Sequence, residues 1–149
     1  MAIEIILNSK LHKISVCNAT DKVLINTHLE GYSDFIKKLS QALIHEECEL
    51  WGDGTLRDTI PGLPIQIDTE DAILYEEFLA KKIMFSLVDN MDAAIEKINT
   101  YSGGHTAVII TADTSIANHF MENIDAASVI HNASSRYTDG GQFGLGAEL

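Results

Sequence analysis

Cys17 stands in a setting that favours a reactive thiol. It lies in the run Ser15-Val-Cys-Asn-Ala19, between an apolar stretch at residues 2–7 and another at residues 23–25. If both stretches are strands and residues 18–21 form a turn of helix, the sulfur lies near the backbone N–H groups of a helix N-terminus, which stabilise a thiolate. This pattern predicts a nucleophile. The alternative is a buried thiol that only fills space, which is the commoner role of a free cysteine.

A second concentration of polar groups follows the last apolar run. Residues 132–148 combine Arg136 and Asp139 with glycines and with hydroxyl and amide side chains. Glycines let backbone N–H groups approach a ligand, and a guanidinium binds phosphate or carboxylate through two parallel hydrogen bonds. The segment therefore predicts an anion-binding loop. The alternative is a flexible chain end without a binding role.

The two segments, with several motifs between them, resemble the gamma-glutamyl phosphate reductases, a family of the aldehyde dehydrogenase superfamily. The resemblance spans residues 8–148, and an ordered succession of motifs is far more specific than any one of them. In chain order the motifs are Ser15-Val-Cys-Asn-Ala19 with Leu24-Ile25, Val88-Asp-Asn90 with Asp92-Ala-Ala-Ile95, Tyr101-Ser-Gly103, Gly104-His-Thr106, Asn132-Ala-Ser134 with Arg136, Thr138-Asp-Gly140 and Phe143-Gly-Leu-Gly-Ala-Glu148.

The resemblance implies NADPH-dependent reduction of gamma-glutamyl phosphate to glutamate 5-semialdehyde, a step of proline biosynthesis. Cys17 matches the catalytic cysteine, which displaces phosphate and forms a thioester, and a thiolate is both a strong nucleophile and a competent leaving group. Glu77 matches a carboxylate that contacts the nicotinamide ribose, and His105 is expected to make a structural hydrogen bond. The candidates for holding the anionic substrate are Asn132, Ser134, Ser135 and Arg136.

The chain departs from the family at single positions and in extent. Asp21, Asn26 and Glu76 stand where the family usually has Glu, His and Thr. The family's dinucleotide-binding domain lies upstream, and a segment used for subunit association begins just after Glu148, so we expect residues 1–149 to form one catalytic domain without either. We expect the complete enzyme to be a homo-oligomer. The chain alone should turn over negligibly, because losing an oxyanion-hole donor costs on the order of 10²–10³ in rate.

Other interpretations of the sequence stay open. The chain could be the reductase part of a bifunctional pyrroline-5-carboxylate synthase, or an aldehyde dehydrogenase acting on another acyl substrate. It could also be a stand-alone, non-catalytic remnant that serves as an acidic binding domain. A structural zinc site could use His45 and Cys48, with His12, His28 and Cys17 brought near by folding. The sequence has no CxxC or HxxxH pair, however, and we expect no metal.

Composition limits the partners. The 149 residues carry 10 basic and 22 acidic side chains, a net charge of −12 without a basic patch, which argues against nucleic acid and anionic membranes. A small anionic substrate needs only one or two local cations and stays compatible with this charge. No apolar run approaches the roughly 18 residues of a membrane span. Two cysteines make no disulfide framework, and we expect a reducing, cytoplasmic setting.

The elements that position these residues follow from apolar spacing. Helical spacing predicts helices over residues 34–46, 91–101 and 113–123, with Ser33 and either Asp113 or Thr114 as N-caps. Residues 71–80 are ambiguous. Short, mostly apolar runs predict strands at residues 2–7, 23–25, 48–51, 83–88, 106–111 and 127–130. The run at residues 106–111 is the continuous kind that is typical of a buried strand. This alternation predicts a three-layer α/β fold, a mostly parallel sheet with helices on both faces, with ligands bound beyond the carboxyl ends of strands.

Overall fold

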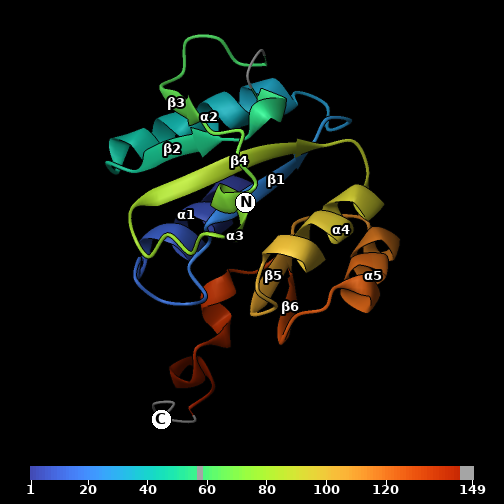
Figure 1. Ribbon diagram of the computed structural model, residues 1–149. Coiled ribbons are helices and arrows are strands. Elements are labelled where there is room, and N and C mark those ends of the chain that lie inside the picture. The colour runs from blue at the N-terminus through green and yellow to red at the C-terminus, as the bar shows by residue number, and fades with distance from the viewer. Residues whose placement is uncertain (57–58, 145–149) are drawn as a thin grey trace.

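Helices and parallel strands alternate along the chain (Figure 1). The computed structural model describes residues 1–56 and 59–144, so residues 145–148 of the predicted anion-binding loop lie outside the described residues. The elements are α1 (Ala2–Leu11), β1 (Lys22–Asn26), α2 (Tyr32–His45), β2 (Glu49–Gly52), η1 (Gly54–Leu56), β3 (Ile65–Ile67), α3 (Ala72–Tyr75), β4 (Lys82–Val88), α4 (Met91–Tyr101), β5 (Thr106–Ile109), α5 (Thr114–Asn123), β6 (Ser128–His131), η2 (Ser135–Thr138) and η3 (Gly140–Phe143).

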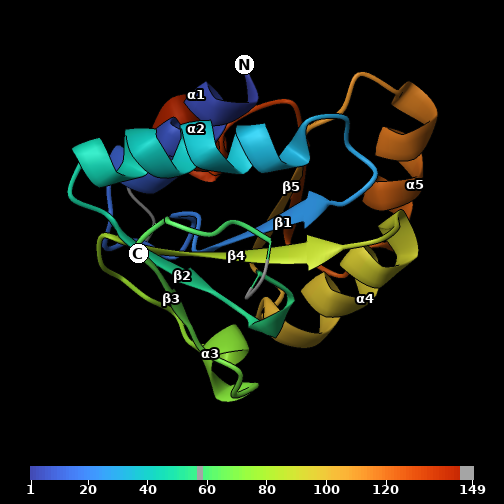
Figure 2. The same cartoon turned by 90° about the horizontal axis from the view of Figure 1, so that it is seen from above.

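The predicted α/β class is confirmed, although the strands form two sheets. One sheet has the order β1-β4-β2-β3 and the other pairs β5 with β6, and every pairing is parallel. Figure 2 shows α1 and α2 on one side of the strands and α3 and α4 on the other, which gives the three layers. The division between β1 and β5 was not expected from the sequence.

The larger core lies between α2 and the four-stranded sheet. Ile36, Leu39 and Leu43 are fully buried at helical spacing on α2, and they pack in the same cluster as Ile83 and Phe85 of β4. The strand β4 lies between β1 and β2 and is covered on both faces, which explains its nearly continuous apolar sequence.

A second core forms around β5 and β6. Ile95 of α4 and Phe120 of α5 pack with Ala107 and Ile109 of β5. The side chain of Asp113 accepts hydrogen bonds from the backbone N–H groups of Ser115 and Ile116 at 2.8 and 3.2 Å, so Asp113 is the N-cap of α5.

The predicted strand at residues 2–7 is wrong, because these residues belong to the helix α1. A short, mostly apolar run, interrupted here only by Glu4, fits a buried strand and a buried helix equally well. Here Ile3, Ile6 and Leu7 share one helical face, which packs on the larger core.

The predicted helical turn after Cys17 is also wrong. The segment forms a tight turn in which the N–H of Ala19 donates to the carbonyl of Val16 at 2.9 Å. Because α1 replaces the expected strand, Cys17 precedes the amino end of β1 and does not follow the carboxyl end of a strand.

Smaller differences concern helix and strand ends. The helix α2 begins at Tyr32, after Gly31 in the left-handed region at φ 72°, so Ser33 lies inside the helix and is not its cap. The strand β3 was not expected, and the ambiguous stretch contains the single helical turn α3. Among the described residues, every helix is too short or too polar to cross a membrane.

Candidate active site

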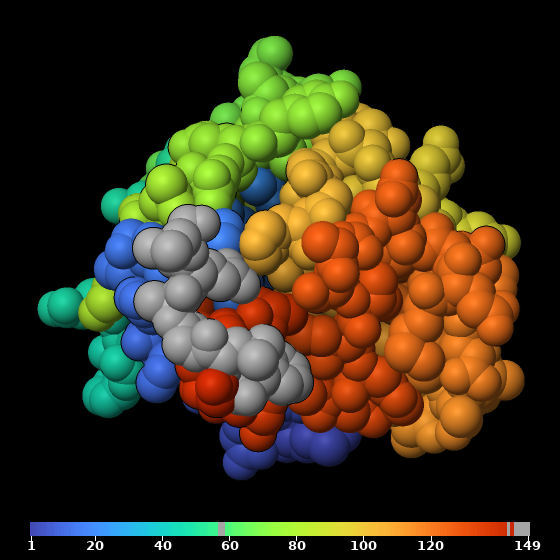
Figure 3. Space-filling view, turned by 90° about the horizontal axis from the view of Figure 1, so that it is seen from below, coloured from blue at the N-terminus to red at the C-terminus, as the bar shows by residue number. Residues whose placement is uncertain are grey.

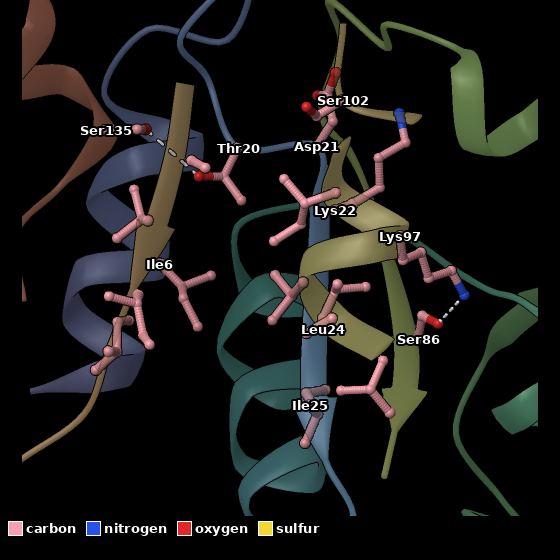
Figure 4. Close-up of a pocket in the computed structure, with 18 of the residues that line it drawn as sticks. Ile6, Thr20, Asp21, Lys22, Leu24, Ile25, Ser86, Lys97, Ser102 and Ser135 are labelled. Carbon is pink, nitrogen blue, oxygen red and sulfur yellow. Dashed lines mark hydrogen bonds between the residues drawn. The ribbon is translucent and has the colours of Figure 1, made fainter. Parts of the chain in front are cut away.

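A cavity of about 1360 Å³ lies between β1 and β5. Figure 3 shows its opening as a hollow between the green segment around residues 70–80 and the gold segment around residues 100–106. Figure 4 shows β5 and β1 on opposite sides, with Ile6 and Leu24 among the side chains that line the space. Cys17 is exposed and lines the same cavity, so its thiol can meet a molecule bound there.

The turn that carries Cys17 is fastened through the next residue, Asn18, which is only 6% exposed. The Asn18 side-chain amide donates to Thr138 Oγ1 at 2.8 Å, and its oxygen accepts from the guanidinium of Arg136. The Asn18 carbonyl accepts from the hydroxyl of Ser135. The segment at residues 135–138 therefore fixes the turn that carries Cys17 through hydrogen bonds to Asn18.

The helix α1 joins the same arrangement through Ser9. Its hydroxyl lies 3.0 Å from the hydroxyl of Ser134 and accepts from the N–H of Ser135 at 3.2 Å, while its carbonyl accepts from the N–H of Thr20 at 3.1 Å. The hydroxyls of Thr20 and Ser135 lie 3.5 Å apart (Figure 4). The helix α1, the turn that carries Cys17 and the segment at residues 134–138 thus meet beside Cys17.

Arg136 is buried, with 7% of its surface exposed. Besides Asn18 it pairs with Asp139 at 2.9 Å, and its Nε has no hydrogen-bond partner among the described residues. The N–H of Gly141, together with Arg136, holds the pKa of Asp139 below its ordinary value. The guanidinium therefore already binds two internal partners, and its predicted contact with a substrate anion stays a prediction.

Asp21 connects the end of the same turn to the segment that contains Glu77. Asp21 Oδ1 pairs at 2.9 Å with Lys10, whose side chain is fully buried, and Oδ2 accepts from the N–H of Phe78 at 2.9 Å. Beside it, burial together with the charges of Lys10 and Lys82 lowers the pKa of Lys22, although Asp21 and Glu76 oppose the shift.

The other predicted site residues lie in different positions. Glu77 is exposed and lines the cavity, as does His105, whose Nδ1 lies 2.6 Å from the hydroxyl of Thr106. The side-chain amide of Asn132 binds the backbone of Thr111: its NH₂ group donates to the Thr111 carbonyl at 2.8 Å, and its oxygen accepts from the Thr111 N–H at 3.0 Å. Of the four predicted substrate-binding residues, Ser135 is the one that lines the cavity.

The second thiol has a different environment. Cys48 is 5% exposed, and burial raises its pKa. Within residues 1–56 and 59–144, no three His, Cys, Asp or Glu side chains gather in a way that could hold a metal ion, so the zinc alternative gains no support there.

Sequence reasoning missed Ser9, Lys10 and Asn18 as parts of the site. Lys10 and Ser9 could not be placed once residues 2–7 were read as a strand. One feature of the sequence could have identified Asn18 as part of the site, namely its position inside the motif that carries Cys17.

Known proteins share both the sequence and the fold. A sequence model of the aldehyde dehydrogenase family matches residues 60–146. The gamma-glutamyl phosphate reductase of Bifidobacterium longum subsp. infantis is 41% identical over 152 residues, covering 99% of this chain and 35% of that protein. The gamma-glutamyl phosphate reductase of Halothermothrix orenii is 38% identical, over 100% of this chain and 34% of that protein. The chain thus spans about a third of the curated relatives it matches.

Solved structures agree with this similarity. The crystal structure of gamma-glutamyl phosphate reductase from Thermotoga maritima superimposes with a TM-score of 0.90 at 38% identity, over 99% of this chain and 34% of that one. A lactaldehyde dehydrogenase superimposes with a TM-score of 0.67 at 16% identity, over 89% of this chain and 36% of its own, which shows a shared fold.

Proposed function

Since the chain belongs to the aldehyde dehydrogenase family, we propose that it is the thiol-bearing part of a gamma-glutamyl phosphate reductase. The relatives of that name support this assignment. The proposal includes the reductase role in proline biosynthesis. The proposal extends to a whole enzyme that is cytoplasmic and homo-oligomeric.

In the proposed reaction Cys17 is the nucleophile. Its thiolate attacks the acyl carbon of gamma-glutamyl phosphate, a C–S bond forms, and the C–O bond to phosphate breaks, with the electron pair leaving on phosphate. The observation that carries the assignment is the contrast between the two thiols. Cys17 is exposed on the cavity wall, whereas Cys48 is buried.

The anionic groups of the substrate need donors and positive charge close to that thiol. Ser135 lines the cavity, and the guanidinium of Arg136 donates to the side chain of Asn18, the residue after Cys17. We assign substrate binding to the segment that contains Asn132, Ser134, Ser135 and Arg136, with Ser135 nearest to the ligand.

The family implies a nicotinamide cofactor, and we propose NADPH, which when bound supplies the hydride that releases the aldehyde. Glu77 fits a contact with the ribose of such a cofactor, because its carboxylate is exposed at the cavity and accepts no hydrogen bond from the described residues. Asp21 links this segment to the Cys17 turn through the N–H of Phe78 and thereby positions Glu77 relative to the thiol.

The rates at which the two thiols are alkylated test the assignment of the nucleophile. Cys48→Ser leaves Cys17 as the one thiol, and Cys17→Ser is the matched variant that leaves Cys48. With iodoacetamide at neutral pH, followed by mass spectrometry, we expect Cys17 to react at least about tenfold faster, as an exposed thiol should. Equally slow reaction of the two thiols would favour an inert cysteine and a non-catalytic binding domain.

A further inference from the structure

The segment that carries Glu77 has no regular secondary structure of its own. Residues 76–79 lie between α3, which ends at Tyr75, and β4, which begins at Lys82. A ladder of backbone hydrogen bonds does not fix such a segment, so its position depends on the side chains that bond to its backbone. The exposed carboxylate of Glu77 is therefore placed by the groups that hold residues 76–78.

Asp21 and Lys22, two consecutive residues at the start of β1, hold the backbone on both sides of Glu77. Figure 4 shows this pair beside the cavity. Asp21 Oδ2 accepts from the N–H of Phe78 at 2.9 Å, and the ammonium group of Lys22 donates to the carbonyl of Glu76. The first bond holds the peptide group after Glu77, and the second holds the peptide group before it. Glu77 is thus clamped through its two neighbouring peptide groups.

The ammonium group of Lys22 serves this backbone bond and not an ion pair. The nearby Lys10 and Lys82 pair with the carboxylates of Asp21 and Glu76 at 2.9 and 3.5 Å, whereas Lys22 bonds to the Glu76 backbone. Burial lowers the pKa of Lys22 although Asp21 and Glu76 oppose the shift, so the position is unfavourable for a charged amine. The bond to the Glu76 carbonyl offsets part of this cost.

Phe78 anchors the other end of the segment. Its side chain is 8% exposed and packs with residues of α3 in a small core. The ammonium groups of Lys22 and Lys82 lie 4.6 and 4.3 Å from the centre of the Phe78 ring, within the range of cation–π attraction. Lys22 therefore contacts the segment twice, at the carbonyl before Glu77 and at the ring after it.

Leu79, directly after this anchor, has a strained backbone. Its φ is 45°, in the left-handed region that a leucine rarely adopts. Its side chain is 48% exposed, so packing of that side chain does not explain the conformation. A residue in this region keeps its conformation only where the surrounding contacts over-determine the backbone. The bonds from Asp21 and Lys22 to the residues just before Leu79 supply such contacts.

We propose that Lys22 is a positioning residue that, together with Asp21, sets the place of the Glu77 carboxylate relative to Cys17. Both residues follow the turn that carries Cys17 and lead into a strand of the larger sheet, so the clamp ties Glu77 to the element that follows the thiol. The inference rests on the proposed function, because it concerns the contact of Glu77 with a nicotinamide cofactor. Loss of Lys22 should weaken cofactor binding and leave the chemistry of Cys17 unchanged.

Amide hydrogen exchange of the 149-residue chain tests the clamp. Lys22→Met removes the donor, Lys22→Arg restores one, and Lys82→Met is the matched control, since Lys82 bonds to the Glu76 side chain and not to its backbone. We expect the Phe78 amide to exchange at least about tenfold faster in Lys22→Met and within about threefold of wild type in the other two variants. The Phe85 amide in β4 should be unchanged, which separates loosening of the segment from global unfolding. No acceleration in Lys22→Met, or an equal one in Lys82→Met, overturns the proposal.

Initial rates of a complete enzyme test the role in cofactor binding. The enzyme is a chimera in which residues 1–149 replace the matched segment of the Bifidobacterium relative, assayed by phosphate-dependent oxidation of glutamate 5-semialdehyde. Lys22→Met should raise KM for NADP⁺ at least about tenfold and change kcat by less than about threefold, and Lys22→Arg should recover most of the loss. Glu77→Gln should raise the same KM. Adding Lys22→Met to Glu77→Gln should change KM little more, because a positioning residue acts through Glu77.

The results separate the role of Lys22 from the proposed function. An active chimera in which Lys22→Met leaves KM for NADP⁺ unchanged, or acts additively with Glu77→Gln, overturns the role of Lys22 and leaves the proposed function standing. A chimera that is inactive with Lys22 intact overturns the proposed function and this role with it.

Discussion

Asn18 is the residue through which the Cys17 turn is fastened to the rest of the molecule. Its side chain accepts a hydrogen bond from the buried Arg136 and donates one to the half-buried Thr138. Asn18→Ala leaves these two partners without their bonds, so we expect the free energy of unfolding to fall by about 1–3 kcal/mol. Urea unfolding followed by circular dichroism measures the change.

The matched control is Asn26→Ala. Asn26 is exposed, and its side chain accepts one hydrogen bond, from the N–H of His28 at 2.8 Å. This control should lose no more than about 0.5 kcal/mol. Equal losses in the two variants would show that the hydrogen bonds of Asn18 do not fasten the turn.

At this scale the sequence identifies residues but not their contacts. Cys17 and Arg136 are recognisable from type and motif. The bond between Asn18 and Arg136 joins positions 118 residues apart, and it depends on η2 returning to the amino end of β1. Nothing in local periodicity specifies that return, so Arg136 was predicted as a ligand-binding residue and not as a partner of the turn.

Among the elements, α4 is joined to the four-stranded sheet by a partly buried ion pair. Lys97 of α4 meets Asp53, which follows β2, and their side chains are 21% and 12% exposed. Burial alone raises the pKa of Asp53, but hydrogen bonds from Lys97, Ser86 and Thr55 outweigh it and hold the pKa below its ordinary value.

Asp53→Asn should therefore destabilise the fold in a pH-dependent manner. Because the folded pKa is depressed, the stabilisation is present above the unfolded pKa of about 3.9 and is lost as pH falls through the folded pKa. At pH 7 we expect a loss of about 3 kcal/mol, since the charge of Lys97 stays without its partner. The difference between wild type and variant should shrink below about pH 4 in urea unfolding curves.

The exposed pair of Asp34 and Lys37 on α2, 3.6 Å apart, provides the control. Asp34→Asn should change stability little at any pH, because solvent screens exposed pairs. A loss for Asp53→Asn that stays constant down to pH 2 would contradict the account of this ion pair.

Strong local signals decided which elements were predictable. The helix α4 was predicted at its observed bounds, because its apolar spacing is regular and Gly103 follows it. The helix α1 was misread because the run at residues 2–7, which only Glu4 interrupts, is too short to separate a helical period from a strand. The strand β3 has three residues and takes its conformation from pairing with β2, which no local pattern reveals.

In the whole molecule, the division of the sheet gives the cavity its position. Composition and alternation predict the fold class, but a gap between β1 and β5 depends on which strands are neighbours, and sequence pattern leaves that open. Because Cys17, Ser135 and Glu77 all line this gap, the candidate site lies where the two sheets face one another.

The central claim is most directly tested by a segment exchange. Residues 1–149 replace the matched segment of the Bifidobacterium relative, and the assay follows phosphate-dependent oxidation of glutamate 5-semialdehyde with NADP⁺. We expect activity in the chimera and in its Cys48→Ser variant, and none in Cys17→Ser or in the 149-residue chain alone. Activity that survives Cys17→Ser, or a folded chimera that is inactive, would contradict the account.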